Sequence, residues 1–454
     1  MHSLLIEVLN NFARGGGGGS GGGSGSGEGG LIIVIRYMPT HFIGHQLAKR
    51  WKSPNCLYVV IAVSIIIAIF WIILFTILSF GFIGWIVAGA ALAGGPVGYY
   101  TYTKWFANIK KTKIGMSQSA ISDKSWDENS VTQMVRQTFV SYQQDWSNFN
   151  VDNMRKYLSP YFWQYNYLMM LAIKLRQRTN MVQNPELIEL APYAMDDEAG
   201  ENQDKLTYYI KAKARDVIYD NFEQKELFVD NNDFIEYWNF TRDNEGWQLD
   251  SIKQATENPI SIVPEISQFA TDNGLFYSPD WGWLLLPQRG QLFSKAKFGL
   301  SDINNHVIGM YHDVLIELYT YVPTTKNTRL TYIIAQLAIP KRYEDLIIKA
   351  KNSFWKIDTE QNMNLFKKDE TKLNRISLEW PDFNKRYKVF ATNVEQVTAF
   401  ELLHPVFMEK LFALKFKVSI EVIDNVIYLY TQDNNAKYEQ MFSVLKDAFE
   451  EMKL

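Results

Sequence analysis

The longest apolar stretch of the chain lies near its N-terminal end. Residues 53–103 contain no charged residue, and basic residues flank them on both sides. One straight helix over residues 57–100 would be about 66 Å long, roughly twice the hydrocarbon thickness of a bilayer. The segment SFGFIG can supply a turn, so we expect a transmembrane helical hairpin over residues 57–103, with the turn near its middle. The alternative is one span plus an interfacial or re-entrant segment.

The flanking charges predict how this hairpin is oriented. Basic residues stand at both outer ends and none stands in the turn, which favours a cytoplasmic location for both flanks. We therefore expect a multi-pass protein of the plasma membrane with cytoplasmic soluble domains. Lysines and an aromatic residue just beyond the apolar stretch would contact the membrane surface, where each lysine near anionic headgroups contributes about 1 kcal/mol. These candidates are Lys104, Trp105, Lys110, Lys111 and Lys113. Fixing the topology alone is the other role open to them.

The segments around the hairpin divide by composition. Residues 1–14 have an apolar stripe at helical spacing and form a short amphipathic segment, and residues 15–30 form a Gly/Ser-rich linker. The glycine tract lacks the Lys-Ser/Thr pair of a phosphate-binding loop. Residues 31–56 form a basic juxtamembrane segment, and residues 104–122 form a basic and polar linker.

The periodicity of the next region predicts helices followed by an antiparallel sheet. Apolar positions recur at helical spacing over residues 131–146, and again from Asn150 to about Arg178 with a pause at Pro160. Residues 206–214 alternate as a strand does. Residues 234–251 read as a hairpin that turns between Asp243 and Gly246. This order is typical of an α+β cone.

These residues carry a resemblance to a known family. The pattern Phe139, Trp146, Asp152, Leu158 and Pro160, followed by EYWNFTR and by Trp247, Leu249, Ile252 and Gln254, is similar to the Tim44-like domain. That family is related to the NTF2-like cone folds, and the resemblance covers residues 123–257, in a bacterial membrane-anchored type. It implies attachment to the membrane and a hydrophobic pocket for a lipid chain or another apolar ligand. The region that recruits the import motor in the mitochondrial protein has no counterpart here.

The tryptophans of the EYWNFTR hairpin have two interpretations. Trp238 and Trp247 on paired strands can pack across the sheet as core, with Arg242 pairing with a carboxylate or stacking on a ring. Alternatively, the aromatics line the pocket of the cone. The candidate lipid-pocket residues are Trp146, Tyr208, Phe234, Trp238, Phe240 and Trp247.

A catalytic role for the cone is the competing hypothesis, because related folds host enzymes. Its candidates are Asp216, Asp233 and Glu236, on or beside strands. Residues 123–257 contain no histidine, which removes the commonest general base. Solvated surface acids are the commoner explanation of such residues, so we expect no catalytic residues and no enzyme.

The remaining residues, 258–454, predict a second α+β domain. Residues 313–322 alternate as a strand, RLTYIIAQLAIP predicts a strand ending at Pro340, and KVSIEVIDNVIYLYTQ predicts a hairpin turning at Asp424. Helices are expected over residues 395–414 and 436–453. The segment FNKRYKVFATNVEQVTAFELLHPVFMEKL resembles a poorly characterised bacterial family of membrane-associated proteins, which brings no assigned activity.

Charge and composition narrow the functional classes. The chain has 46 basic and 49 acidic residues, so no overall excess of positive charge favours nucleic acid. Its single cysteine and the absence of an HExxH motif predict no metal site, and no cofactor is expected. We therefore expect a membrane-anchored binding or scaffold protein, with the lipid bilayer, its anionic lipids, and a client polypeptide or membrane complex as partners. The alternative is an enzyme acting on a lipid-like or apolar substrate in the cone.

Overall fold

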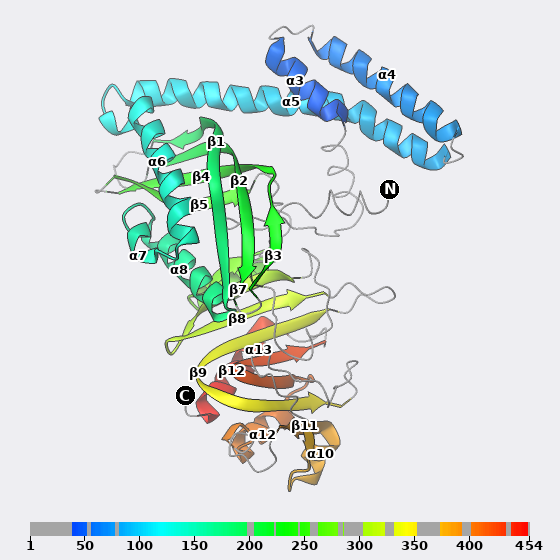
Figure 1. Cartoon of the computed structure of the whole chain (residues 1–454), viewed down its shortest axis with the longest axis vertical. Coiled ribbons are helices and arrows are strands. Elements are labelled where there is room, and N and C mark those ends of the chain that lie inside the picture. The colour runs from blue at the N-terminus through cyan, green and yellow to red at the C-terminus, as the bar shows by residue number, and fades with distance from the viewer. Residues whose placement is uncertain are drawn as a thin grey trace.

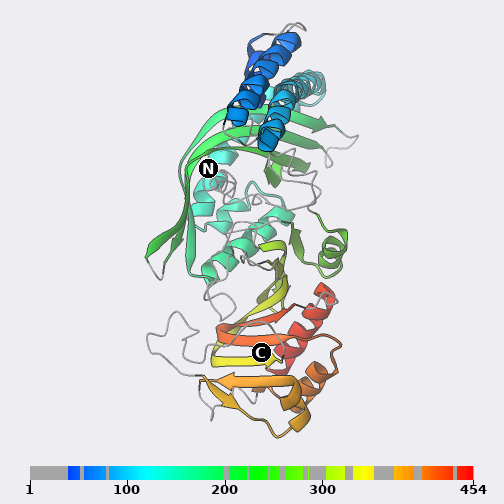
Figure 2. The same ribbon diagram turned by 90° about the vertical axis from the view of Figure 1, so that its right-hand side faces the viewer.

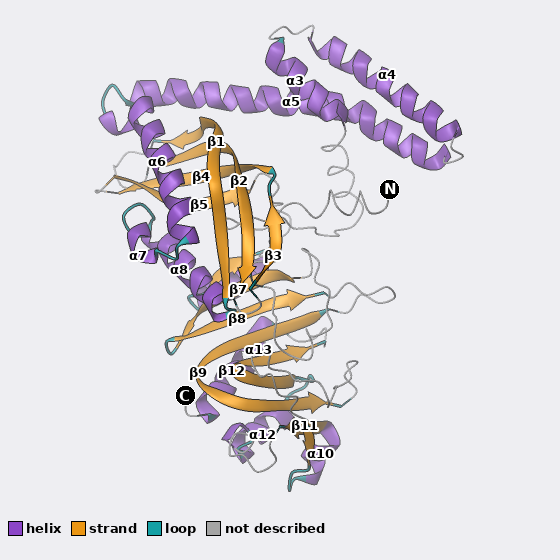
Figure 3. Ribbon diagram, viewed as in Figure 1, coloured by secondary structure: helices purple, strands orange, loops and turns teal. Residues whose placement is uncertain are grey.

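The computed structural model describes most of the chain in three parts along its long axis (Figure 1). The described residues are 39–51, 56–77, 81–197, 204–221, 224–243, 246–254, 262–279, 285, 303–322, 331–351, 373–392, 401–432 and 437–452. The expected segments 1–14 and 15–30 lie outside them. A group of helices occupies one end, a helix-and-sheet domain lies in the middle, and a second helix-and-sheet domain lies at the other end (Figure 3). The α+β class expected from the sequence is confirmed.

Three helices build the first part: α3 (Pro39–Arg50), α4 (Cys56–Ile77) and α5 (Gly81–Ser119). Helices α4 and α5 lie side by side and antiparallel (Figure 1). Among the described residues, one segment, Cys56–Leu74 of α4, is long and apolar enough to cross a bilayer. One candidate span supports membrane association. The multi-pass arrangement expected from the sequence is not supported by this finding.

Helix α5 differs from the expected second half of a hairpin because it does not end at residue 103, where the uncharged stretch ends. It continues without interruption to Ser119, with Pro96 inside it, so the residues expected as a linker from 104 onward are helical. Their spacing explains this: Ile109, Thr112 and Met116 are buried at intervals of three and four residues and give the helix one buried face. At about 1.5 Å per residue, its 39 residues extend about 58 Å.

Glycines allow α3 to cross α5 in close contact. A Cβ atom on Gly44 would collide with the backbone carbonyl of Gly95, and one on Gly98 would collide with the backbone of His41. A Cβ atom on Gly95 would meet the hydroxyl of Ser64 on α4. The three helices therefore meet at a point where small residues bring backbones together, as at helix crossings in membranes.

The middle domain pairs three helices with a curved sheet. The chain passes through a short 3-10 turn (Lys124–Trp126), α6 (Glu128–Ser147), α7 (Val151–Met154) and α8 (Pro160–Leu175). The strands are β1 (Arg178–Asp196), β2 (Lys205–Asp220), β3 (Lys225–Asp230), β4 (Asp233–Asp243) and β5 (Gly246–Gln254). Their order is β1-β2-β4-β5, with β3 also on β2, and every pairing is antiparallel. The sheet curves around the helices (Figure 2).

Side-chain hydroxyls and carboxylates fix where these helices begin. Asp127 accepts a hydrogen bond from the backbone N–H of Ser130 at the start of α6, and Ser159 accepts one from Phe162 at the start of α8. Pro160 is the first residue of α8, where a missing N–H costs nothing. The expected pause at Pro160 is therefore a helix start.

The C-terminal domain is a second mostly antiparallel sheet with helices. Its helices are α9 (Pro264–Asp272), α10 (Pro381–Arg386), α12 (Pro405–Ala413) and α13 (Tyr438–Glu451). Its strands are β6 (Phe276–Ser278), β7 (Ile303–Tyr311), β8 (Val314–Tyr321), β9 (Tyr332–Ala350), β10 (Asn374–Ile376), β11 (Tyr387–Ala391) and β12 (Ser419–Thr431). The order is β10-β11-β9-β8-β7-β6, and β12 also pairs with β9.

Two strand predictions in this domain were wrong. The strand expected to end at Pro340 continues through it to Ala350. The segment expected to turn at Asp424 is the single strand β12, and Asp424 forms an irregularity within it, with φ of 55° and register shifts on both sides. An Asp-Asn pair is compatible with a bulge as well as with a hairpin turn, because both place a residue in the left-handed region. The part of the first expected helix before residue 401 lies outside the described residues.

Candidate functional site

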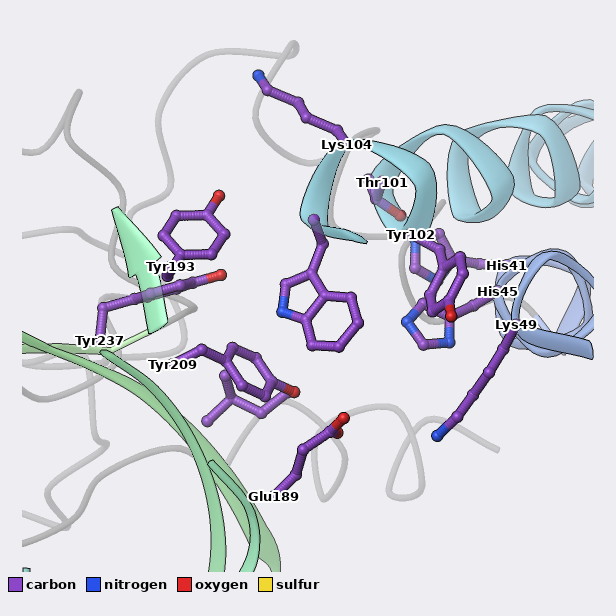
Figure 4. A pocket seen from close by; sticks show the side chains of 12 residues that line it. His41, His45, Lys49, Thr101, Tyr102, Lys104, Glu189, Tyr193, Tyr209 and Tyr237 are labelled. Atoms are coloured by element: carbon purple, nitrogen blue, oxygen red, sulfur yellow. The ribbon is translucent and has the colours of Figure 1, made fainter. Parts of the chain in front are cut away.

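A pocket of about 370 Å³ lies where the long helices meet the middle domain. Three elements on different parts of the chain enclose it: α3, α5, and the face of the β1-β2-β4 sheet that lies opposite α6. Its lining residues are His41, His45, Lys49, Thr101, Tyr102, Lys104, Trp105, Glu189, Tyr193, Tyr209, Ile235 and Tyr237 (Figure 4). We call it the junction pocket.

Strand alternation explains which tyrosines reach the junction pocket. On β2, Tyr208 and its neighbour Tyr209 point to opposite faces. The Tyr208 hydroxyl lies 2.9 Å from Thr132 Oγ1 on α6, so it belongs to the inner face. The ring of Tyr209 packs edge-on against Trp105 of α5, with centroids 5.2 Å apart, so it belongs to the outer face.

Aromatic rings form a continuous wall on the sheet side of the junction pocket. Tyr237 of β4 lies between Tyr193 and Tyr209, with ring centroids 4.8 Å and 5.9 Å from its own. On the helix side, His45 packs edge-on against Tyr102, at 4.8 Å. Figure 4 shows His41, His45 and Lys49 on one side of the space and Tyr193, Tyr209 and Tyr237 on the other.

Positive charge is concentrated around the helix side. Burial lowers the pKa of His45 below its usual value, and the nearby charges of Lys49 and Lys211 lower it further. The imidazole therefore serves as a neutral hydrogen-bonding group at pH 7, while Lys49 and Lys104 are the lysines of the lining. Burial and the charge of Glu189 also raise the pKa of Tyr209, which keeps its phenol protonated.

Two lining groups have hydrogen-bonding capacity to spare. The indole N–H of Trp105 is buried and has no hydrogen-bond partner among the residues that the structure describes. Among the described residues, Glu189 forms no ion pair with Lys49 or Lys104, although all three line the same space. A buried donor without a partner costs about 1–3 kcal/mol, which a ligand can recover.

The aromatic residues predicted for the cone pocket lie elsewhere. Trp146, Tyr208, Phe234, Trp238 and Phe240 are buried in one hydrophobic core between the sheet and α6 and α8, and Trp247 packs partly buried against it. Trp146 donates to Asn180 Oδ1 at 2.6 Å, Trp238 to Glu236 Oε2 at 2.8 Å, and Trp247 to the carbonyl of Ser125 at 3.0 Å. These contacts are those of a packed core, and a ligand role for them stays a prediction.

The expected packing of Trp238 against Trp247 is not formed. They lie on paired strands, but Trp238 is opposite Ile252 and Trp247 is opposite Arg242. Trp247 instead packs edge-on against Trp126, at 4.9 Å, while Trp238 contacts rings of α6.

Arg242 makes both of the interactions considered for it from the sequence. Its guanidinium forms ion pairs with Asp123 at 2.6 Å and with Asp204 at 2.7 Å. It also lies over the Trp247 ring, 5.8 Å from the centroid.

The predicted membrane-surface residues follow one another along α5. Lys104 and Trp105 line the junction pocket, whereas Lys110, Lys111 and Lys113 are exposed further along the same helix. Lys113 forms an ion pair with Glu128 at 2.5 Å. The helix therefore separates the predicted set into a pocket pair and a solvent-facing group.

The carboxylates considered as catalytic candidates have structural partners. Asp216 is buried and accepts from Asn180 Nδ2 at 2.5 Å, and Glu236 is buried and accepts from Gln254 Nε2 at 2.6 Å. Asp233 is exposed and pairs with Lys211 at 3.2 Å. Within the described part of the chain, no group of three or more His, Cys, Asp or Glu residues is placed to hold a metal ion.

Comparisons with known proteins identify the C-terminal region only. Residues 330–454 match a family described as a protein of unknown function, DUF3137, which agrees with the uncharacterised family expected there. No curated protein matches the chain. The match covers less than half of the chain and carries no activity.

The chain also has weak similarity to solved structures. One is the mycobacterial trehalose monomycolate transport factor A, TtfA, with 11% identity over 41% of this chain and 93% of that one and a TM-score of 0.30. Another is the intermembrane space region of the chloroplast protein ARC6, with 9% identity over 27% of this chain and 97% of that one and a TM-score of 0.23. An Ntf2-like protein involved in plasmid conjugation shows 10% identity over 44% of this chain and 84% of that one, with a TM-score of 0.17. Similarity this weak does not establish a Tim44-like domain.

Little in the sequence indicates the junction pocket. His41, His45 and Lys49 lie in the segment predicted only as a basic juxtamembrane segment, and no ligand role was predicted for Tyr193, Tyr209 or Tyr237. The one available signal was alternation: Tyr208 and Tyr209 are adjacent, so one of them had to leave the inner core.

Proposed function

We propose that this protein is a membrane-anchored binding or scaffold protein whose middle domain binds lipid or a client polypeptide at the membrane surface. The observation that carries the proposal is the continuity of α5, which runs from contact with the apolar helix α4 into contact with β1 of the middle domain. One rigid element thus belongs both to the candidate membrane anchor and to the soluble body.

The surface of α4 supports its placement in lipid. Only 17% of the apolar part of α4 is buried. Large aliphatic side chains are exposed along the helix, with Ile66 exposed by 66% and Ile69 by 50%. Exposed apolar patches of this extent are rare on soluble monomers. Contact with hydrocarbon would remove this surface from water.

A second span formed by the first half of α5 is the finer part of the proposal. The two helices pack antiparallel, and Gly95 brings α5 close to Ser64 of α4. Both soluble domains would then lie on the cytoplasmic side, with Lys49 and Lys104 at the same membrane edge. A Tim44-like assignment of the middle domain also belongs to the proposal and rests on the sequence resemblance.

The enzyme hypothesis draws no comparable support. Its carboxylates Asp216 and Glu236 accept hydrogen bonds within the core. If Asp216→Asn or Glu236→Gln abolished turnover of a lipid-like substrate while thermal stability was retained, an enzymatic function would replace the proposed one.

Membrane integration can be tested by placing a charge on α4. We expect the full chain to float with lipid vesicles and to resist alkaline carbonate extraction. Ile66→Lys places a lysine near the middle of the candidate span, where it costs about 2.5–3.5 kcal/mol, and should increase the extracted fraction. The matched control is Ile121→Lys, because Ile121 is 85% exposed and lies beyond α5.

Two results would contradict the proposal. One is a full chain that stays soluble without detergent and does not float. The other is an equal response to Ile66→Lys and Ile121→Lys. Protease protection on sealed vesicles then counts the spans, because two spans place both soluble domains on the same side as residues 39–51.

A further inference from the structure

The two walls of the junction pocket differ in charge. Its helix wall carries Lys49 on α3 and Lys104 on α5, whereas its sheet wall carries tyrosine rings and the carboxylate of Glu189 on β1 (Figure 4). A ligand with a single charge would find an unfavourable group on one wall. A ligand with a negative and a positive group a few ångströms apart could place each group against the wall that attracts it.

We propose that the junction pocket binds the headgroup of a zwitterionic phospholipid, one that carries both a phosphate and an ammonium group. This inference rests on the proposed function, because only a membrane-anchored chain holds the pocket at a lipid surface. The phosphate faces Lys49 and Lys104, and the ammonium lies over the tyrosine rings beside Glu189.

The position of the lysines places the pocket at headgroup depth. Lys49 precedes the uncharged stretch of residues 53–103, and Lys104 is the first residue after it. Both lie at the boundary where apolar sequence gives way to charge, which in a bilayer is the headgroup layer. The close crossing of α3 and α5 at Gly98 brings both lysines to the same space.

The phosphate side offers donors as well as charge. Trp105 lines the pocket, and its buried N–H has no partner within the described part of the chain, so a phosphate oxygen can accept from it. Burial is the main cause of the lowered pKa of His45, and the charges of Lys49 on α3 and Lys211 on β2 add to it, so positive charge lies near this imidazole. These positive charges attract a phosphate.

The ammonium side has the composition of an aromatic cage. The rings of Tyr193, Tyr209 and Tyr237 adjoin one another, with centroids 4.8 Å and 5.9 Å apart. Ring faces attract alkylammonium groups, and a nearby carboxylate adds to this attraction. Glu189 fits this role because it forms no ion pair with either lysine of the pocket among the described residues. For a purely anionic ligand, Glu189 would be repulsive.

The size of the pocket agrees with a small polar headgroup. Its volume of about 370 Å³ lies at the lower end of the range for small-molecule sites. The acyl chains would then remain in the bilayer beside α5.

The test uses the full chain in neutral detergent, titrated calorimetrically with short-chain lipids below their micelle concentrations. The probes are dihexanoyl phosphatidylcholine, dihexanoyl phosphatidylethanolamine, dihexanoyl phosphatidylglycerol and inorganic phosphate. We expect the phosphatidylcholine or the phosphatidylethanolamine to bind about tenfold or more tightly than phosphatidylglycerol and phosphate, a difference of about 1.4 kcal/mol. Equal or tighter binding of phosphatidylglycerol would overturn the proposal in favour of an anionic-lipid site. Tighter binding of phosphate alone would also overturn it, in favour of a soluble anion.

Variants separate the two walls. Glu189→Gln should weaken zwitterionic lipid about fivefold or more while leaving phosphatidylglycerol unchanged or tighter, and Lys104→Ala should weaken both. The matched controls are Glu186→Gln, on the same strand, and Lys110→Ala, on the same helix, because neither residue lines the pocket. Loss of binding in a control equal to that in its pocket variant would contradict the assignment.

The two proposals can fail separately. A chain that floats with vesicles but shows no headgroup selectivity disproves the pocket assignment and leaves the membrane anchor intact. A chain that fails to float disproves the anchor, whatever the short-chain lipids do.

Discussion

Arg176, the residue that follows helix α8, donates two hydrogen bonds to the carboxylate of Glu317 on β8, at 2.9 Å and 3.1 Å. His306 Nε2 lies 2.9 Å from the same carboxylate, and Gln336 donates to it at 2.7 Å. Glu317 is almost fully buried. Because Arg176 belongs to the middle domain and its partners belong to the C-terminal domain, this cluster fixes the two domains to each other.

Removing the charge of Glu317 should therefore destabilise the joint. Breaking a buried ion pair by removing one partner costs about 3–5 kcal/mol, since the other charge stays buried without compensation. Glu317→Gln should lower the thermal midpoint of the detergent-solubilised chain. The matched control is Glu226→Gln, which breaks an exposed pair with Arg215 (2.8 Å) and should cost under about 1 kcal/mol. Similar losses in both variants would contradict a buried joint.

Acid should weaken the same joint. Burial alone would raise the pKa of Glu317, but the charge of Arg176 and the hydrogen bond to His306 outweigh it and lower the pKa from 4.5 to about 2. A carboxyl whose pKa is lower in the folded state stabilises the protein fully above its unfolded pKa and loses this contribution as pH falls towards its folded pKa. Between pH 4.5 and 2 the loss should reach roughly 3 kcal/mol. Thermal melting across this range should show a shallower decline in Glu317→Gln than in the wild type; parallel curves would exclude the effect.

A single methyl group should separate α3 from α5. Gly98→Ala directs a Cβ atom into the backbone of His41, which cannot rotate away, and overpacking of this kind costs about 1–3 kcal/mol. Gly89→Ala is the matched control on the same helix, because a Cβ atom there meets nothing within 4 Å. Proteolysis of detergent-solubilised chain should cleave near residues 39–51 faster in Gly98→Ala only. Unchanged cleavage in Gly98→Ala would indicate that α3 does not rest on α5.

Truncation of Trp238 should test whether the cone aromatics are core or pocket. Trp238 is fully buried against Phe139 and Tyr142, so Trp238→Ala should cost about 3–5 kcal/mol of stability. Val140→Ala, on the opposite side of α6 and half exposed, should cost well under 1 kcal/mol. Loss of lipid binding in Trp238→Ala with an unchanged melting temperature would instead favour the pocket interpretation.

Local patterns predicted much of the architecture. Alternation predicted the β4–β5 hairpin, and Pro160 predicted a pause in the helical pattern where α8 begins. Both signals act over a few residues, where chain geometry dominates. The uninterrupted α5 was missed because its polar second half looks like a linker unless the sheet that buries Met116 is known.

The junction pocket could not be predicted, for a related reason. Lys49, Lys104, Glu189 and Tyr237 come from four separated segments, and only the folded sheet and the close α3–α5 crossing bring them together. The same holds for Arg176 and Glu317, 141 residues apart in sequence. A short-range sequence pattern does not predict which distant residue will complete such a cluster.

The unbroken helix α5 has a mechanical consequence. In the proposed arrangement with two spans, one end of α5 is held by lipid and its other end is packed against β1, so α5 cannot change its tilt without turning the attached domain. Bilayers of different thickness impose different tilts on a spanning helix. A thicker or thinner membrane would therefore change the orientation of the C-terminal domain. This domain lies farthest from α5, so the same change of tilt would displace it most.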